Sequence, residues 1–426
     1  DVAPARAAQA PSVKAVGVDG QKTGSRATLI ICDDVEVPKN SATVEAREKL
    51  VDNIMEVEAI ILPEGRVVFL GTPQTEESVY KTLREKGYET RIWPALVPLV
   101  SKIDSYHGCL APSIAKYIGT PREGRATDTR FTTEDLNQRE SFWGRSGFAL
   151  QFMLDTSLSD AERYPLKTGD LVVADYVDPE HGPTLVHWSR QKVDTSLGCV
   201  GFSGDRWYQA PPPPSDILYK PYEGRMMFID PSGRGSDECV AVVIYQLHGK
   251  LFLADLMATK DGYGDETLEG FAMMAKRHKV NTVISEANFG DGMFNKLLQP
   301  WLIKVNHRCT LDEVKHSQQK EKRIIDTLEP VLNQHRLVID RRLIKKDLAL
   351  IEKEQTRPYS LLHQLTRVTR EKGALRHDDR LDALAGGVAY WVESMARDHE
   401  DAHESWHDQE QERGIEEFLS YIDHMN

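Results

Sequence analysis

Residues 225–238 have the sequence RMMFIDPSGRGSDE, in which an apolar run ends in Asp230. A second apolar run, in NTVISEANFGDGMF (281–294), ends in Glu286, and HDDRLDALAGGVAYW (377–391) places Asp379 and Asp382 at the start of an apolar helix. Carboxylates at the ends of buried elements are suited to holding hard divalent cations against phosphate oxygen. The pattern predicts a metal-dependent phosphodiesterase, although Asp230 alone, followed by Pro231, would be more typical of a turn or a helix cap.

The order of the expected elements is more specific than any single acid. Hydrophobic periodicity predicts strands at 226–229, 240–247 and 251–257, a helix at 265–278, a strand at 280–285, helices at 293–304 and 319–334, and a strand at 336–339. The helix at 319–334 should kink or end at Pro330, which lacks a backbone N–H. A mixed five-stranded sheet, followed by a helix that opens with DxxD, is the order of an RNase H-like (RuvC-like) nuclease.

The chain resembles the large terminase subunits of short-tailed bacteriophages, which package DNA. The segments DPSGRGSDE, EANFGDGMF, DTLEPVLNQHRLVI and TREKGALRHDDRLDALA are similar to the nuclease half of that family. LIICDDVE (29–36) and FLGTPQ (69–74) are similar to its ATPase half, and the similarity runs from residue 12 to residue 394. The resemblance implies an α/β chain in which a P-loop-type ATPase domain precedes an RNase H-like nuclease domain.

Four segments are expected along the chain. Residues 1–165 would be the C-terminal part of the ATPase domain, 166–215 a linker that ends in the proline run 211–214, 216–396 the nuclease domain, and 397–426 an acidic tail. The sequence contains no GxxxxGK[ST] segment, the loop whose backbone amides and Lys cradle nucleotide phosphates. We therefore expect an incomplete ATPase core, in the C-terminal portion of a longer packaging protein.

Hydrolysis of a phosphodiester with two metal ions gives each nuclease acid a role. Two Mg²⁺ or Mn²⁺ ions would stabilise the attacking and the leaving oxygen, and Asp230 would bridge them. Glu286 and Asp382 would each complete the shell of one ion, with Asp379 one helical turn from Asp382 on the same helix face. Because these carboxylates repel one another, metal binding should stabilise the domain. His377 would either orient a water molecule or simply be a polar residue at the helix start.

Two segments of the N-terminal part resemble motifs of nucleotide motors. An apolar strand candidate ends in Asp33 and Asp34, as in a Walker B motif, where such an acid holds Mg²⁺ beside nucleotide phosphates. Asp33 would be the acid on the metal side, and either Asp34 or Glu36 would orient the attacking water; a purely structural acid pair is the alternative. Thr72 and Gln74 follow the next strand and would belong to the coupling motif that senses the γ-phosphate. The complete motor would use ATP with Mg²⁺.

The net charge of −13 is unusual for a DNA-binding protein, but the tail from 397 onward carries most of the excess. Basic residues gather at 315–323, 341–346 and 367–376, which permits a positive surface that faces DNA. Candidates for contacts with DNA are Lys320, Lys322 and Arg323, together with Asp291 in a glycine-flanked loop; a solvated surface and an ordinary loop are the alternatives. The apolar spacing at 415–422 predicts a short docking helix on the acidic tail, or else the tail only aids solubility.

Composition and the resemblance limit the setting in which the chain works. Five cysteines lie far apart without CxxC spacing, which argues against a zinc site and a secreted disulfide framework and favours a reducing cytoplasm. No apolar stretch approaches the length of a membrane span. The resemblance implies four partners: double-stranded DNA, the portal ring of the procapsid, the small terminase subunit, and further copies of the chain in a ring on the portal. The implied location is the host cell cytoplasm, transiently the portal vertex, and not the mature virion.

The expected function is that of a packaging endonuclease that cuts concatemeric double-stranded DNA within an ATP-driven motor. A RuvC-like resolvase or a transposase-type nuclease would share the nuclease core and the DxxD helix, but LIICDDVE and FLGTPQ argue against both. A non-enzymatic, capsid-associated DNA-binding protein is the other alternative.

Overall fold

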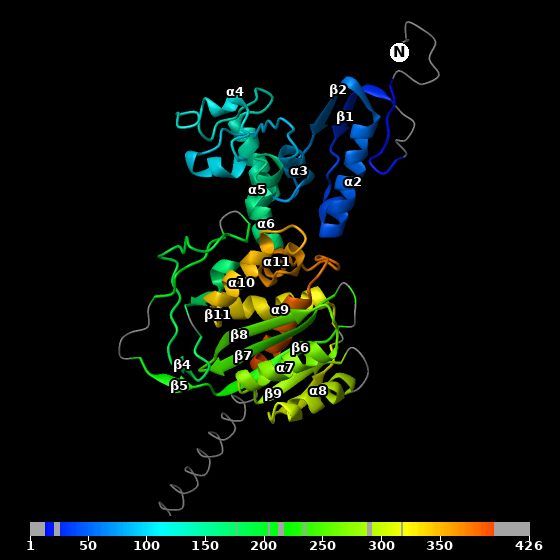
Figure 1. Cartoon of the computed structure of the whole chain (residues 1–426). Helices are drawn as coiled ribbons and strands as arrows, with labels where there is room; N and C mark the ends of the chain where they lie inside the picture. The colour runs from blue at the N-terminus through cyan, green and yellow to red at the C-terminus, as the bar shows by residue number, and fades with distance from the viewer. Residues whose placement is uncertain are drawn as a thin grey trace, which may run out of the picture. The chain divides into compact units, whose positions relative to one another are not determined.

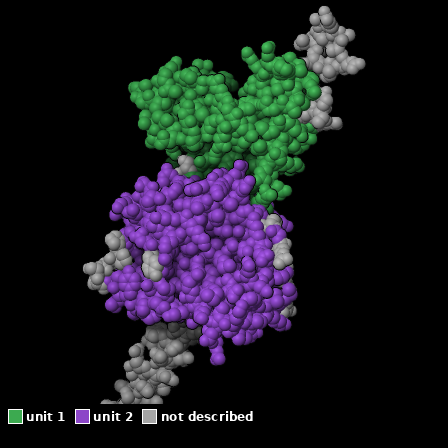
Figure 2. Space-filling model, viewed as in Figure 1, with its two compact units in different colours: residues 1–164, 202–204, 373–376 green, residues 165–201, 205–372, 377–426 purple. Residues whose placement is uncertain are grey.

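The computed structural model describes residues 13–20, 26–175, 177–202, 205–211, 217–232, 235, 237–287, 292–316 and 318–395. Three features expected from the sequence lie outside the described residues: the acidic tail at 397–426, prolines 212–214 of the proline run, and Asp291. The chain divides into two compact units (Figure 2). Unit 1 comprises residues 1–164, 202–204 and 373–376, and unit 2 comprises 165–201, 205–372 and 377–426.

Unit 1 contains a β-α-β arrangement. Strands β1 (Ala27–Asp33) and β2 (Ile61–Leu70) pair in parallel and are joined through α1 (Pro38–Ser41) and α2 (Val44–Ile60). The hydroxyl of Thr43 caps α2 by accepting a hydrogen bond from the backbone N–H of Ala46, and α2 packs Leu50 and Ile54 into a small apolar core. The other helices of this unit are α3 (Val79–Glu85), α4 (Pro112–Ala115), α5 (Thr133–Gln151) and α6 (Ser157–Arg163).

Unit 2 is built on a sheet that has seven strands among the described residues, in the order β10-β9-β6-β7-β8-β11-β3. Strands β6, β7 and β8 are antiparallel, whereas β9, β10, β11 and β3 join through parallel pairings. The strand bounds are β3 (Val172–Ala174), β6 (Gly224–Asp230), β7 (Cys239–Leu247), β8 (Lys250–Thr259), β9 (Thr282–Glu286), β10 (Thr310–Val314) and β11 (Leu337–Asp340). Two short strands, β4 (His181–Pro183) and β5 (Tyr219–Pro221), pair apart from this sheet.

Helices cover both faces of the sheet (Figure 1). All nine residues of β7 are buried, which explains why this central strand is a nearly continuous apolar run rather than an alternating one. One face packs against α7 (Asp265–Arg277) and α8 (Met293–Lys304). The rest of the unit contains α9 (Lys320–Asn333), α10 (Arg341–Ile351), α11 (Leu361–Arg367) and a helix over 379–395.

Two glycines bring the helix over 379–395 unusually close to the sheet. A Cβ atom on Gly386 would lie 2.2 Å from the Phe228 ring of β6, and one on Gly387 would lie 2.8 Å from the Ile244 side chain of β7. Any larger side chain would therefore push the helix away from the sheet. The close approach holds the start of the helix, with its acids, near the carboxyl end of β6.

The predicted fold class is confirmed, with three differences in detail. The sheet has β10 and β3 in addition to the five expected strands; the apolar run 171–177 predicts a strand where β3 lies, but within the segment that we expected to be a linker and not in this sheet. Helix α9 continues beyond Pro330 to Asn333, so of the two effects expected of Pro330, a kink or an end of the helix, the second is wrong. Ile325, Leu328 and Val331 of α9 are buried, and this packing outweighs the single hydrogen bond that Pro330 cannot make. Among the described helices, none has the length and apolarity needed to cross a bilayer.

Candidate active site

Asp230, Glu286 and Asp382 converge on one point of unit 2. Ile229 of β6 pairs with Ser285 of the parallel strand β9, so the next residue of each strand, Asp230 and Glu286, lies at the same edge of the sheet. Asp382 reaches this edge from the first turn of the helix over 379–395. One carboxylate oxygen from each residue lies within 4.8 Å of the others, a spacing that could hold a metal ion. The sequence prediction that these three acids meet agrees with this geometry.

The group is buried, and its electrostatics reflect that burial. Asp230 is only 6% exposed and Asp382 only 2%. Burial raises the pKa of Asp230 well above its usual value, and the negative charges of Asp382, Glu286 and Asp379 raise it further, against the opposing effect of Lys320. An ionised carboxylate at this position therefore lowers the stability of the fold. Carboxylates with such raised pKa values are common at functional sites.

Two basic residues of α9 contact these acids directly. The Lys320 ammonium lies 2.8 Å from Asp378 and 3.1 Å from Asp382, and Arg323 lies 2.6 Å from Asp382 and 3.9 Å from Glu286. Burial disfavours the charged form of Lys320, but the surrounding carboxylates outweigh burial and raise its pKa. Both residues were expected on a surface that faces DNA, whereas here they neutralise part of the acid group. Lys322, the third basic candidate, is exposed to solvent.

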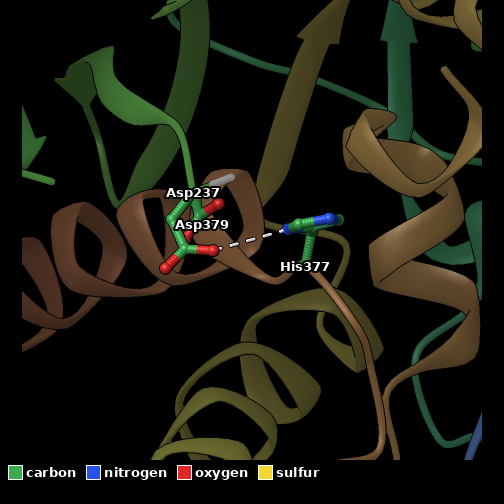
Figure 3. A group of neighbouring side chains, drawn as sticks. All are labelled: Asp237, His377 and Asp379. Carbon is green, nitrogen blue, oxygen red and sulfur yellow. Dashed lines mark ion pairs between the residues drawn. The ribbon is translucent and has the colours of Figure 1, made fainter. Parts of the chain in front are cut away.

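Asp379 belongs to a different group from Asp382. It comes together with Asp237 and His377, and ligand atoms of the three residues lie within 4.8 Å of one another (Figure 3). His377 Nδ1 lies 3.6 Å from a carboxylate oxygen of Asp237, and Asp379 accepts a hydrogen bond of 3.0 Å from the backbone N–H of Glu238. Burial raises the pKa of Asp379 to about 6, while the Glu238 N–H and Lys320 oppose the rise.

Asp237 was not among the residues predicted from the sequence to form the site. It lies just before β7, on the connection that follows Asp230, and the one available signal was its place in DPSGRGSDE. His377 was considered only as a water-orienting or helix-start residue, but it is buried and its ring stacks on Tyr359 at 4.3 Å between centroids. The stacking fixes the imidazole plane beside the two carboxylates.

The acids of unit 1 occupy two different environments. Asp33 and Asp34 are exposed at the end of β1. Glu36 is 2% exposed, and its two carboxylate oxygens accept hydrogen bonds from the backbone N–H groups of Gln74 (2.7 Å) and Val79 (2.6 Å). Burial raises the pKa of Glu36, and these two hydrogen bonds oppose the rise. Glu36 therefore ties the end of β1 to the segment that contains Thr72 and Gln74.

Comparison with known proteins identifies the family. Residues 229–337 match the family model described as Terminase Bacteriophage T7, Ribonuclease H-like domain. The large terminase subunit of Enterobacteria phage T3 is 46% identical over 412 residues, which are 93% of this chain and 70% of that relative. The chain belongs to the large terminase subunits of bacteriophages. The resemblance seen in the sequence is confirmed, and the resolvase, transposase and capsid-protein alternatives are set aside.

Solved structures of terminase nucleases also match this terminase, at low similarity. The nuclease domain of the large terminase subunit gp2 of bacterial virus Sf6 is 13% identical, covering 40% of this chain and 89% of that one, with a TM-score of 0.29. A human cytomegalovirus terminase nuclease domain, soaked with Mn and bound to an inhibitor, is 11% identical, covering 40% of this chain and 82% of that one, with a TM-score of 0.28. The T3 relative and the family model are what show the family of this chain. The described chain includes a terminase nuclease domain of RNase H-like type.

Proposed function

We propose that this terminase cuts concatemeric double-stranded DNA with two divalent cations, Mg²⁺ or Mn²⁺. The convergence of Asp230, Glu286 and Asp382 within 4.8 Å is the observation that carries the proposal. Three carboxylates so close together, two of them buried and that of Glu286 half-buried, repel one another unless cations are bound, and carboxylate oxygens are the donors that hard divalent cations prefer. The donor set thus fits the cofactor that the family implies.

The two groups of side chains suggest how the cations are shared. Asp230, Glu286 and Asp382 would hold one ion, and Asp379 would contribute to a second together with Asp237 and His377. Because imidazole is a better ligand for Mn²⁺ than for Mg²⁺, the second group should favour Mn²⁺. Bound cations would supply the positive charge that activates water and stabilises the phosphate oxygens in hydrolysis.

Side chains of the protein contribute to the same reaction. Lys320 and Arg323 add positive charge beside the first group of acids, where it complements a DNA phosphate. The Glu238 N–H holds the Asp379 carboxylate in one orientation, and the Tyr359 ring does the same for His377. Asp378, whose nearest cation is Lys320 at 2.8 Å, would hold that ammonium in place rather than bind metal.

Cleavage of linear plasmid DNA by the 426-residue chain tests this proposal. We expect cutting with Mg²⁺ or Mn²⁺, none with EDTA, and a loss of at least about a hundredfold in Asp230→Asn and Glu286→Gln. Asp326→Asn is the matched control, because Asp326 is an exposed carboxylate of α9 that pairs with Arg370. Metal-dependent cutting that survives in both active-site variants would refute the assignment of these acids.

We also propose that unit 1 belongs to the ATP-driven motor that translocates the genome. Asp33 would lie on the Mg²⁺ side of ATP, and Asp34 would orient the attacking water, because both oxygens of Glu36 already accept backbone hydrogen bonds. Thr72 and Gln74 would couple nucleotide state to movement through Glu36. The motor would act as a ring on the procapsid portal, with the small terminase subunit, in the host cytoplasm. In a terminase preparation that hydrolyses ATP, Asp34→Asn should abolish hydrolysis while ATP binding persists; normal hydrolysis would reject this role.

A further inference from the structure

A pocket in unit 2 shares no lining residue with either group of acids. Its volume is about 360 Å³, and it lies between the end of α7 and the start of α10. Apolar walls come from Val177, Pro179, Ala254 and Leu343. Pockets that bind small molecules begin at about this size and usually combine apolar walls with a few placed polar groups.

A chain of hydrogen-bonded side chains forms one wall of the pocket. The Tyr245 hydroxyl contacts His278 Nδ1, and His278 Nε2 lies 3.0 Å from Asp255 Oδ2. Because the carboxylate can only accept, this contact is a hydrogen bond when Nε2 carries a proton; the Arg277 guanidinium also contacts Nε2 at 3.3 Å. Burial alone would raise the pKa of Asp255, but His278 and Arg277 outweigh burial and lower it. His278 and Arg277 therefore offset the negative charge of Asp255.

The other acid of the lining, Asp340, also has its negative charge engaged. Asp340 accepts hydrogen bonds from the backbone N–H groups of Val177 (3.0 Å) and Arg342 (2.7 Å) and from the Arg342 guanidinium. Lys346, one helical turn further along α10, is exposed and makes no ion pair with any residue in the described part of the chain. Arg277 pairs with Asp255 and Arg342 pairs with Asp340, so the lining has three cations against two acids, and Lys346 is the lining cation that has no acid partner among the described residues.

We propose that this pocket binds a phosphate-bearing ligand of mononucleotide size. Lys346, with Arg342 four residues before it on α10, would hold the phosphate, and the apolar side chains of the lining would contact the base and sugar. The ligand would be either a free nucleotide or the unpaired terminal nucleotide of a DNA strand, which present the same chemistry. The site needs no metal ion, so it is independent of the proposed nuclease reaction.

Calorimetric titration of dAMP into the 426-residue chain in EDTA tests the proposal. We expect a Kd below about 1 mM. Lys346→Gln and, separately, Arg342→Gln should each weaken binding about tenfold, because each removes a charged contact with phosphate. Lys345→Gln makes the same charge change one residue away on α10, outside the pocket lining, and should leave the Kd within about twofold. Deoxyadenosine, which lacks phosphate, should bind at least about tenfold more weakly than dAMP.

Competition with DNA then separates the two sources of the ligand. If a duplex with a one-nucleotide 5′-phosphorylated overhang displaces dAMP and a blunt duplex does not, the ligand is a strand end. If neither duplex displaces dAMP, the ligand is a free nucleotide. The proposal fails if wild type shows no binding of dAMP up to about 10 mM, if Lys346→Gln, Arg342→Gln and Lys345→Gln have equal effects, or if a blunt duplex competes as well as the overhang.

Discussion

Replacing Asp160 with Asn should stabilise unit 1 at neutral and alkaline pH. Asp160 is fully buried in α6 and accepts a hydrogen bond of 2.8 Å from the backbone N–H of Glu76. Burial raises the pKa of Asp160 from 3.8 to about 7, and the Glu76 N–H opposes that rise only in part. Asn keeps an oxygen that can accept the same hydrogen bond, but it never becomes charged.

The size of the effect follows from linkage between protonation and folding. A carboxyl group whose pKa is higher in the folded than in the unfolded state holds its proton more tightly when folded, so stability falls as pH rises from 3.8 to about 7. The full penalty above this range is about 4 kcal/mol, since each pKa unit corresponds to about 1.4 kcal/mol. Between pH 5 and pH 8 the advantage of Asp160→Asn should grow by about 2.5 kcal/mol.

Hydrogen exchange of the Glu76 amide is the appropriate assay, because it reports on the opening of unit 1 separately from unit 2. The variant and the wild type are compared at the same pH, so that the intrinsic pH dependence of exchange cancels. The protection of this amide in Asp160→Asn should exceed that of wild type at pH 8 and approach it at pH 5. An advantage that is equal at both pH values would show that the charge of Asp160 is not what limits stability, and would refute the reasoning.

Three further perturbations test other parts of the structure. Lys320→Met should lower the melting temperature of the metal-free protein and should make the rise in melting temperature on adding Mn²⁺ larger, both measured by calorimetry. If Mn²⁺ raises the melting temperature of variant and wild type equally, Lys320 does not balance the charge of the acids. Gly386→Ala should destabilise unit 2 by about 1 to 3 kcal/mol in urea unfolding, because its Cβ would overlap a ring of β6, whereas Gly198→Ala, which meets nothing within 4 Å, should be nearly neutral; the reverse order would reject the packing argument. Glu36→Ala should cost at least about 2 kcal/mol by leaving two buried N–H groups unbonded, while Asp33→Ala at an exposed position should cost less than about 0.5 kcal/mol; equal losses of amide protection in unit 1 would contradict this.

The central strands could be predicted from sequence because a strand that is buried on both faces has a nearly continuous run of apolar residues. β6, β7, β8 and β9 are apolar runs that end at polar residues, and their expected limits lie within two residues of the observed ones. The two edge strands of the sheet, β10 and β3, were harder to predict. β10 has the sequence TLDEV, which is too polar to stand out, and the apolar run 171–177 predicts the strand that contains β3 but not its pairing with β11, more than 160 residues away.

The acids of the candidate site could be predicted for a similar reason, but their partners could not. Asp230 and Glu286 follow apolar strands, so local sequence alone indicates where they lie. Lys320 and Arg323 approach Asp382 from about 60 positions away, and the sequence shows them only as part of a basic cluster. Asp379 and Asp382 are three residues apart on one helix, yet they belong to different groups. Asp379 joins Asp237 and His377, where the backbone N–H of Glu238 binds Asp379 and the Tyr359 ring stacks on His377. These contacts come from segments far from Asp379 in the sequence, so the sequence does not show them.

The charges around the first group of acids suggest that metal and DNA bind together. Lys320 and Arg323 oppose four carboxylates, those of Asp230, Glu286 and Asp382 and that of Asp378, which pairs with Lys320, so about two negative charges remain before any cation binds. These charges repel a DNA phosphate, and a divalent cation offsets them. The cation should therefore favour binding of the phosphate, and by linkage the phosphate should favour binding of the cation. We therefore expect the affinity for Mn²⁺, measured by calorimetry, to increase when a cleavage-resistant oligonucleotide is present, and to increase less in Arg323→Gln, which leaves the group more negative from the start. An Mn²⁺ affinity that is the same with and without DNA would show that the two basic residues serve only to hold the carboxylates in place.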